Sequence, residues 1–272
     1  MKAKELFLKG VGKIKNFRLT RKVFAYPYVL FMLAFIVAPL VVLFVNAFLA
    51  ADGSFTFDNF GDFFSDSVNL SVLGMSVAVG AITTAICLLI GYPLAYIVSK
   101  WSSGSVIVLL TILPMWVNFL IRTYALKAIF NAVNVPLGVG TVIIGMVYNF
   151  IPYMIMPLHT TLSNIDPSYA EAAKDLGATP VETFFKTTLP LSLPGIVSGI
   201  TMVFIPTISA FAISGMLSNN TVLMFGDSIN IKFMNQLYGT GSVMSIVMLI
   251  LVLVLNFFMN RANKGEAPKG IW

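Results

Sequence analysis

Six long apolar stretches constrain this chain more than any other feature, because each can cross the roughly 30 Å hydrocarbon core of a bilayer as a helix. They are residues 26–50, 70–98, 106–125, 139–162, 193–216 and 242–259. Of the 272 residues 58% are hydrophobic and only 10% are charged, a composition that excludes an ordinary soluble domain. The sequence therefore predicts an all-α membrane protein with six transmembrane helices in residues 24–260.

The basic residues predict how the chain is oriented in the membrane. Eight of the 17 Lys and Arg lie in residues 2–22, which predicts a basic amphipathic segment over residues 1–23 on the inner leaflet. A cleaved signal peptide would need a shorter apolar core than residues 26–50 provide. With the N-terminus inside, fourteen basic residues face the cytoplasm and three face outward, as the positive-inside rule requires. We therefore expect a multi-pass protein of the cell membrane with a cytoplasmic tail at 261–272, and no nucleic-acid partner.

One polar interruption, residues 163–192, lies on the predicted cytoplasmic side and is typical of two short helices. Asp166 is placed to cap the first helix, which Pro167 opens and Gly177 ends. Thr179 and Glu182 form a capping box that opens the second helix, and we expect that helix to end before Pro190.

Each of these two helices has an apolar stripe that the segment cannot bury by itself. The stripes consist of Tyr169, Ala172, Ala173 and Leu176 on the first helix and Val181, Phe184 and Phe185 on the second. A partner protein would cover them, and the alanines would let its surface approach closely. An amphipathic hairpin lying on lipid headgroups is the alternative interpretation.

The interruption resembles a known family. Its Glu171-Ala172-Ala173, Gly177 and Leu189-Pro190 resemble the EAA coupling loop in permease subunits of binding-protein-dependent ABC importers, which have the type I, MetI-like fold. Over most of the chain, the resemblance extends to the PotB-type permeases of spermidine/putrescine importers. It is carried there by the stretches 55–60, 114–124 and 189–196. Thr187 departs from the usual isoleucine, and Ser218-Asn219-Asn220 replaces an expected Gly-Gly pair.

The resemblance implies that Glu171, Ala172, Ala173, Gly177, Leu189 and Pro190 dock on a cytoplasmic ATPase. It also implies a second, homologous permease, two ATPase subunits, an extracytoplasmic binding protein and a polyamine cargo. The chain has no P-loop motif, so we expect a transport subunit rather than an enzyme, with no cofactor or metal of its own and with ATP and Mg bound by the ATPase subunits. Another small solute remains an alternative cargo, and a secondary transporter or a scaffold remains an alternative class.

Polar and aromatic groups inside the apolar stretches are candidates for the substrate pathway, because such groups are costly in lipid. Trp116, Asn118, Arg122 and Tyr124 lie in the third stretch. A continuous helix would place Asn118 and Arg122 on one face, with Asn118 about 20 Å from the cytoplasmic end. Alternatively, Arg122 reaches the headgroups and Asn118 bonds a neighbouring helix.

The fifth stretch contains Pro206 near its midpoint, where a kink would mark the pathway or merely fit the bundle. Ser209 follows it, and Phe204 and Phe211, seven residues apart, would share a helical face that lines a gate or packs. Asp227 would add charge from an outer loop. The predicted spans contain no Asp or Glu, so aromatic faces or acids of the second permease would have to receive a polyamine.

The first outer loop, residues 51–69, has four aspartates, five phenylalanines and no basic residue. It resembles the short outer helix of these permeases. The loop could receive a binding protein or gather cations near the entrance. Alternatively, its aromatic residues simply lie in the interfacial belt of the membrane.

Overall fold

The computed structural model describes residues 25–50, 52–101 and 104–263. The predicted basic segment 1–23 and most of the predicted tail 261–272 lie outside the described residues. Within the described ranges the chain is helical apart from its connections and one isolated bridge between Leu49 and Phe55.

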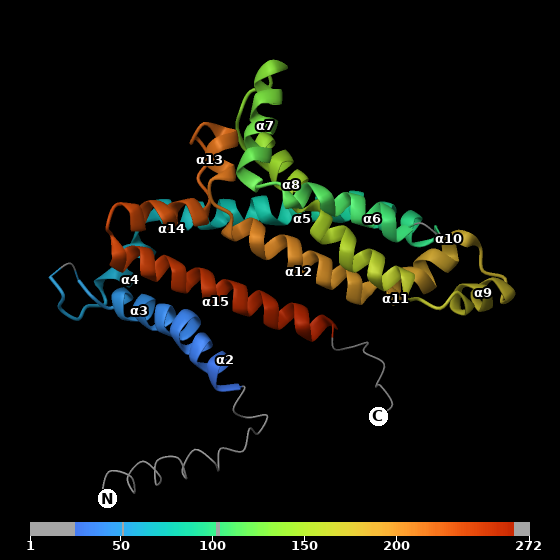
Figure 1. Cartoon of the computed structure of the whole chain (residues 1–272), viewed down its shortest axis with the longest axis horizontal. Helices are drawn as coiled ribbons and strands as arrows, with labels where there is room; N and C mark the ends of the chain where they lie inside the picture. Colours follow the sequence, from blue (N-terminus) through green and yellow to red (C-terminus); the bar gives the residue numbers. More distant parts are fainter. Residues whose placement is uncertain (1–24, 51, 102–103, 264–272) are drawn as a thin grey trace, which may run out of the picture.

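Three helices form the centre of the bundle: α5 (Ser67–Ser99), α8 (Val139–Ser163) and α12 (Leu193–Ser209), each of which packs against the other two (Figure 1). Glycines allow this close approach, as is common between membrane helices. A Cβ atom on Gly199 would lie 2.6 Å from Met154 Sδ, and one on Gly80 would lie 2.9 Å from Ile208. The helices therefore pack backbone against side chain at these points.

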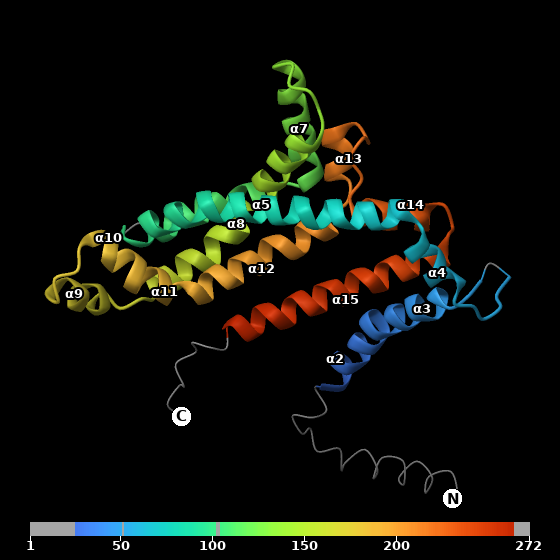
Figure 2. The same ribbon diagram turned by 180° about the vertical axis from the view of Figure 1, so that it is seen from behind.

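A second buried cluster joins the start of the chain to its end. Helix α15 (Tyr238–Asn263) packs against α3 (Ala38–Ala47), α4 (Asp58–Ser65), α12 and α14 (Phe225–Met234). The rings of Phe63 and Phe225, both fully buried, lie 6.2 Å apart in this cluster. Figure 2 shows α3 and α15 side by side from behind.

The third apolar stretch is not one continuous helix. Helix α6 (Gly104–Ile112) passes into a 3-10 turn (Leu113–Trp116), and α7 (Phe119–Ala132) then leaves at 90°. Pro114 cannot donate a backbone hydrogen bond, and Val117 is extended, so the helix cannot continue. The predicted depth of Asn118 along a straight helix is therefore wrong.

The fifth stretch is also shorter than predicted. Helix α12 ends at Ser209, and a break at residues 210–212 precedes the short helix α13 (Ile213–Ser218). Ala212 has a φ of +70°, a conformation that no α-helix contains. Pro206 consequently lies near the end of its helix and not at a midpoint.

Two wider, π-helical turns occur in the structure, and each precedes a proline. The first, η1 (Leu33–Val37), joins α2 (Ala25–Met32) to α3, in which Pro39 is the second residue. The second, η3 (Phe184–Thr188), joins α10 (Pro180–Thr183) to α11 (Leu189–Leu191), in which Pro190 is the second residue. In both turns the residue before the proline donates to the carbonyl five residues back, so the helix accommodates the ring without ending.

The short helices α9 (Ser168–Asp175) and α10 lie at the opposite end of the long axis from α4 (Figure 1). They are the two short helices that the sequence predicts for the polar interruption, whose cytoplasmic location stays a prediction.

Four described helices are long and apolar enough to cross a membrane, or up to six if each bent pair is one span. The four are Tyr26–Ala47, Ser67–Ser99, Val139–Ser163 and Tyr238–Met259, and they confirm the first, second, fourth and sixth predicted stretches as helices. The bent pairs are Val106–Trp116 with Phe119–Ala132, and Pro180–Leu191 with Leu193–Ser209. A count of six spans stays a prediction.

We expect Gly195→Ala to destabilise the bundle by about 1–3 kcal/mol, the usual cost of an added methyl in a packed interior. The new Cβ would lie 2.6 Å from Thr161 Oγ1 and 3.1 Å from the Pro157 carbonyl, which belongs to the backbone and cannot rotate away. Thermal unfolding in detergent measures the effect. Gly74→Ala is the matched control, since its Cβ would meet nothing within 4 Å and should leave the melting temperature unchanged or slightly raised. Equal melting temperatures for the two variants would contradict the packing described for α8 and α12.

Candidate functional site

Helix α9 begins at Ser168, one residue after the predicted Pro167, and it ends before Gly177 as the sequence predicts. Asp166 Oδ1 accepts a hydrogen bond from the Ser168 amide at 2.9 Å, and this bond lowers the pKa of the Asp166 carboxyl. Gly177 has a φ of +86°, and its amide donates to the Lys174 carbonyl at 2.8 Å. A Cβ on Gly177 would meet nothing within 4 Å, so the backbone conformation, rather than space, requires glycine here.

Helix α10 begins with the predicted capping box. The Thr179 amide donates to Glu182 Oε2 at 3.0 Å, and the Glu182 amide donates to Thr179 Oγ1 at 3.3 Å. Lys186 Nζ lies 3.2 Å from Glu182 Oε1. These contacts, with the Thr179 amide first, lower the pKa of Glu182 from its ordinary 4.5 to about 2.

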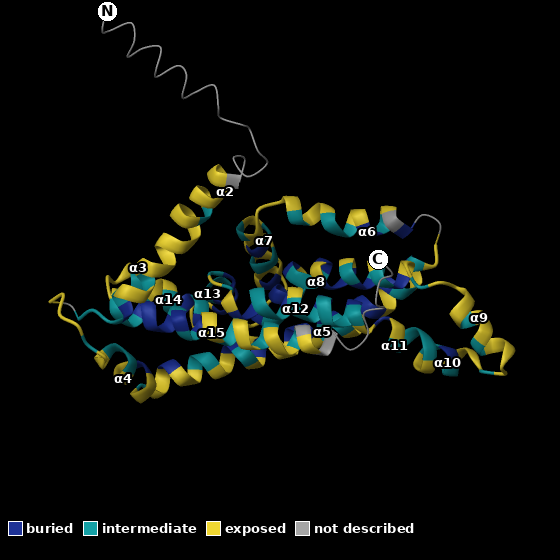
Figure 3. Ribbon diagram, turned by 90° about the horizontal axis from the view of Figure 1, so that it is seen from below, coloured by how far each residue is buried: buried dark blue, intermediate teal, exposed yellow. Residues whose placement is uncertain are grey.

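Most of the apolar stripe on the helix pair is uncovered within the chain. Tyr169 and Leu176 on α9 are 56% and 90% exposed, and Val181 and Phe185 on the following turns are 64% and 59% exposed. Ala172 is exposed beside them and Ala173 is half-buried. Figure 3 shows α9 coloured almost entirely as exposed. An apolar face of this kind is typical of a surface that contacts another protein or a membrane.

Phe184 is the exception in this stripe, because it turns inward. Its ring packs edge-on against Tyr96 at 5.4 Å and Tyr92 at 5.9 Å, both on α5. The Tyr92 hydroxyl lies in turn 2.9 Å from the buried Ser192 hydroxyl. The helix pair is therefore anchored to the central bundle at its second helix.

The expected end of the second helix before Pro190 is wrong. The helical path runs on through the π turn to Leu191, and the Leu189 amide donates to the Phe184 carbonyl. The bend falls at Ser192 instead, where the path turns by 61° into α12. Leu189 and Pro190, both half-buried, lie in the connection between the helix pair and the bundle.

Glu171 lines a polar groove of about 420 Å³ between α9 and the ends of α5 and α8. Lys100 and Lys174 line the same groove, and Lys100 Nζ lies 4.8 Å from the centre of the Tyr96 ring. The groove thus combines both signs of charge next to the apolar stripe.

The candidates of the third stretch do not converge on one site. Asn118 precedes α7 and caps it, since its Oδ1 accepts from the Leu120 amide at 2.8 Å. Trp116 and Tyr124 are 78% and 62% exposed on the outside of the chain. Only Arg122 of this group lines a cavity.

That cavity measures about 250 Å³ and brings together residues of α7, α8 and α12. Its walls include Arg122, Asn149, Tyr153, Pro206, Ser209 and Phe211. Arg122 Nε and Nη1 and Asn149 Oδ1 are buried and have no hydrogen-bond partner in the chain. The predictions included Arg122, Ser209 and Phe211 but missed Asn149 and Tyr153. The polar Asn149 inside the fourth apolar stretch, four residues before Tyr153, was the signal available for them.

Phe204 and Phe211 do not share a helical face. The helix ends at Ser209, so the spacing of seven residues no longer places the two rings on one face. Phe204 packs against the cluster that contains Ile208 and Phe225, whereas Phe211 lines the Arg122 cavity.

Asp227 is 7% exposed, and donors within the chain surround its carboxylate. It accepts from the Ala212 amide at 2.8 Å, from the Met224 amide at 2.9 Å and from the Ser214 hydroxyl. These bonds hold the break after α12 against the start of α14. The carboxylate therefore has a structural role and is not a free charge at an outer loop.

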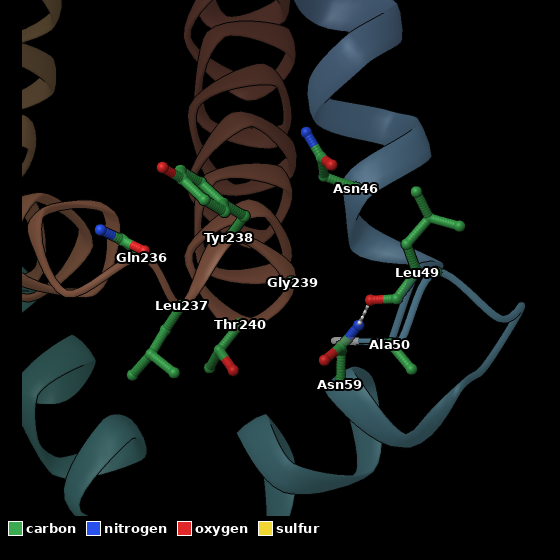
Figure 4. Close-up of a pocket in the computed structure, with 10 residues that line it drawn as sticks. Asn46, Leu49, Ala50, Asn59, Gln236, Leu237, Tyr238, Gly239 and Thr240 are labelled. Carbon is green, nitrogen blue, oxygen red and sulfur yellow. Dashed lines mark hydrogen bonds between the residues drawn. The ribbon is translucent and has the colours of Figure 1, made fainter.

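The end of the bundle that contains α4 has a pocket of about 400 Å³ between the end of α3, helix α4 and the start of α15 (Figure 4). Asn59 crosses its edge, donating to the carbonyls of Ala47 at 3.1 Å and Leu49 at 2.9 Å. Phe48 stacks on Phe55 at 5.7 Å beside it. The short outer helix predicted for residues 51–69 is present as α4, which follows this cluster.

The family model for the binding-protein-dependent transport system inner membrane component matches residues 87–266. The chain belongs to this family. It is 33% identical to the spermidine/putrescine transport system permease protein PotB of Haemophilus influenzae, over 86% of this chain and 90% of that protein.

Solved structures of ABC transporters share the fold. A bacterial alginate ABC transporter in complex with alginate pentasaccharide-bound periplasmic protein has a TM-score of 0.69 at 14% identity, covering 92% of this chain and 96% of that one. An inward-facing structure of the MetNI methionine ABC transporter has a TM-score of 0.59 at 18% identity, covering 73% and 96%. The all-helical, MetI-like permease fold is therefore confirmed.

We expect Glu182 to titrate near pH 2 in the folded protein, well below the same residue in a denatured peptide. Because folding lowers this pKa, ionised Glu182 stabilises the start of α10 above about pH 4.5, and the contribution disappears as the pH falls toward 2. An NMR titration of glutamate carboxyl carbons in nanodiscs measures the midpoint. The signal that is absent from the Glu182→Gln variant is assigned to Glu182. Lys186→Met should raise the midpoint part of the way, because the Thr179 amide remains. A midpoint equal to that of the denatured peptide would contradict the capping box.

Proposed function

We propose that this chain is the permease subunit of an ATP-driven importer that translocates the polyamines spermidine and putrescine, delivered by an extracytoplasmic binding protein. The observation that carries the cargo is the 33% identity to a spermidine/putrescine permease across nearly the whole chain. The family supplies the transport class, and its description supplies the binding protein.

The uncovered stripe on α9 and α10 supports a cytoplasmic ATPase as the partner. Its exposed apolar side chains lie beside the two-signed groove of Glu171 and Lys174, a combination suited to a protein surface. In this proposal Glu171, Ala172, Ala173 and Gly177 make the docking contact. Leu189 and Pro190 connect it to the bundle. The complex contains a second, homologous permease and two ATPase subunits, which bind ATP and Mg, and both termini of this chain lie in the cytoplasm.

In the proposed cycle, ATP binding draws the two coupling loops together and opens the pathway outward, and hydrolysis resets it. The helical path from α10 through α11 to α12 would transmit this movement, since only the bend at Ser192 interrupts it. Arg122, Ser209 and Phe211 are the proposed pathway residues, because they line the cavity at the far end of α12. Trp116 and Tyr124 offer exposed aromatic faces nearby in sequence. The proposed pathway does not include Asn118, Phe204 or Asp227. Their side chains cap α7, pack in a buried cluster and hold the break after α12, respectively.

We assign the outer pocket and helix α4 to the binding protein. Helix α4 has exposed aspartates at 58 and 62, and the adjoining Phe55 and Phe57 are more than 60% exposed. Charged and aromatic side chains beside a concave pocket are typical of a protein contact.

The uptake of labelled spermidine into proteoliposomes tests the proposal. The liposomes hold this chain with the second permease and the ATPase, and the binding protein is added outside. We expect ATP-dependent uptake that unlabelled spermidine or putrescine suppresses and that an amino acid or a sugar does not. Uptake that requires an ion gradient would overturn the importer class. A complex that hydrolyses ATP without taking up spermidine would overturn the cargo alone.

We expect Glu171→Lys to abolish spermidine uptake and to release the ATPase from the detergent-purified complex, while the chain stays in the membrane. The substitution reverses a charge at the edge of the uncovered stripe. Asp62→Lys is the control for ATPase retention, since it makes the same charge change on exposed α4 at the opposite end. Retained ATPase and unchanged uptake in Glu171→Lys would show that coupling does not use this helix.

A further inference from the structure

The Arg122 cavity contains a positive charge that no acidic side chain of the described residues pairs with. Two guanidinium nitrogens of Arg122, Nε and Nη1, are buried without a hydrogen-bond partner. The guanidinium stays protonated in proteins, so the charge cannot be removed by releasing a proton. The Tyr148 ring lies 5.8 Å from it, which offsets only part of the cost of burying an unpaired cation.

The described residues offer no carboxylate for Arg122. Nine acidic residues are described, of which four lie in the outer loop and four in the coupling loop. The ninth is Asp227, whose oxygens accept three hydrogen bonds elsewhere. The one ion pair found among the described side chains joins Lys186 to Glu182, at the coupling end.

A polyamine cannot satisfy Arg122 either, because a protonated polyamine has only N–H donors and positive charge. It can satisfy the other orphan group of the cavity, since Asn149 Oδ1 is an acceptor on a side chain only 3% exposed. Phe119, Phe150, Tyr153 and Phe211 supply aromatic faces around it, which attract ammonium groups. The cavity therefore offers a cation one acceptor and several aromatic rings, and Arg122 is the lining group that would repel it.

We propose that an acidic side chain of the second permease enters this cavity and pairs with Arg122, and that the paired carboxylate, together with Asn149 and the aromatic walls, completes a subsite for a cargo ammonium. The inference rests on the proposed function for the cargo and for the second permease. Charge complementarity selects the occupant: a carboxylate accepts hydrogen bonds from the guanidinium N–H groups and cancels the charge that would repel a polyamine. The subsite is complete only in the assembled transporter.

Carboxyl-directed labelling of the whole transporter tests this pairing without requiring transport. A membrane-permeant carbodiimide with an amine nucleophile is applied to wild-type, Arg122→Gln and Lys127→Gln complexes, and mass spectrometry locates each modified acid. Lys127→Gln is the matched control because it removes a positive charge from the same helix α7 outside the cavity. We expect one acid of the second permease to be labelled in Arg122→Gln and protected in the other two complexes.

Uptake provides the second measurement. Arg122→Gln should lower the maximal spermidine uptake by about tenfold or more, the loss expected when one member of a desolvated charge pair is removed. Reversing the pair, with Arg122→Glu and arginine at the labelled acid, should restore part of the uptake. Arg122→Lys, which retains the charge, controls for folding and should protect the acid in part.

Unchanged labelling of every second-permease acid, in an Arg122→Gln complex that purifies intact, would overturn the proposal. So would competition by an amine that has a carboxylate, such as 4-aminobutanoate, if it requires Arg122, since the guanidinium would then bind cargo. Failure of the proposed function is a separate result: the wild-type complex would take up no spermidine, while the labelling pattern would still report the pair.

Discussion

The structure depends on one constraint: a backbone amide or carbonyl that lies in lipid must find its partner within the chain. Helices meet this constraint, but each proline lacks a backbone N–H and interrupts the helical hydrogen bonds. At Pro39 and Pro190 the chain widens into a π turn and stays helical. At Pro114 it breaks, and the Asn118 side chain supplies the missing acceptor at the start of α7. Near Pro206 the helix ends within a turn, and Asp227 accepts from the Ala212 amide beyond it. At each of these four prolines the chain therefore adapts locally.

These solutions explain what the sequence could and could not predict. Long apolar runs without an internal break, such as residues 70–98 and 139–162, were found almost to the residue, because length and hydrophobicity determine them. The caps at Asp166, Thr179 and Gly177 were found because capping chemistry is local. The breaks in the third and fifth stretches were missed, because a proline in a membrane helix either bends it or ends it according to its neighbours. The inward turn of Phe184 follows from Tyr92 and Tyr96, which are distant in sequence.

Both ends of the bundle leave side chains uncovered. At the end that contains α4, Asn59 satisfies two carbonyls and Phe48 stacks on Phe55, but Phe55 and Phe57 stay more than 60% exposed. At the coupling end and in the Arg122 cavity, apolar faces and polar atoms remain without partners. Unsatisfied groups of this kind cost about 1–3 kcal/mol each, so a chain retains them where another molecule supplies the missing contact. Under the proposed function, the ATPase would cover the apolar face of α9 and α10, and the second permease would supply the partner of Arg122.

The path from α10 to α12 consists of two helical arms of unequal length that meet at a bend of 61°. Its short arm is the turn that presents Val181 and Phe185, its corner is Ser192, and its long arm is the 17-residue α12, about 25 Å in length. The Tyr92 hydroxyl of α5 contacts Ser192 at the bend. In the proposed cycle, a turn of this path about Ser192 would move Pro206 and Ser209, near the end of the longer arm, through a larger arc than the side chains on the short arm.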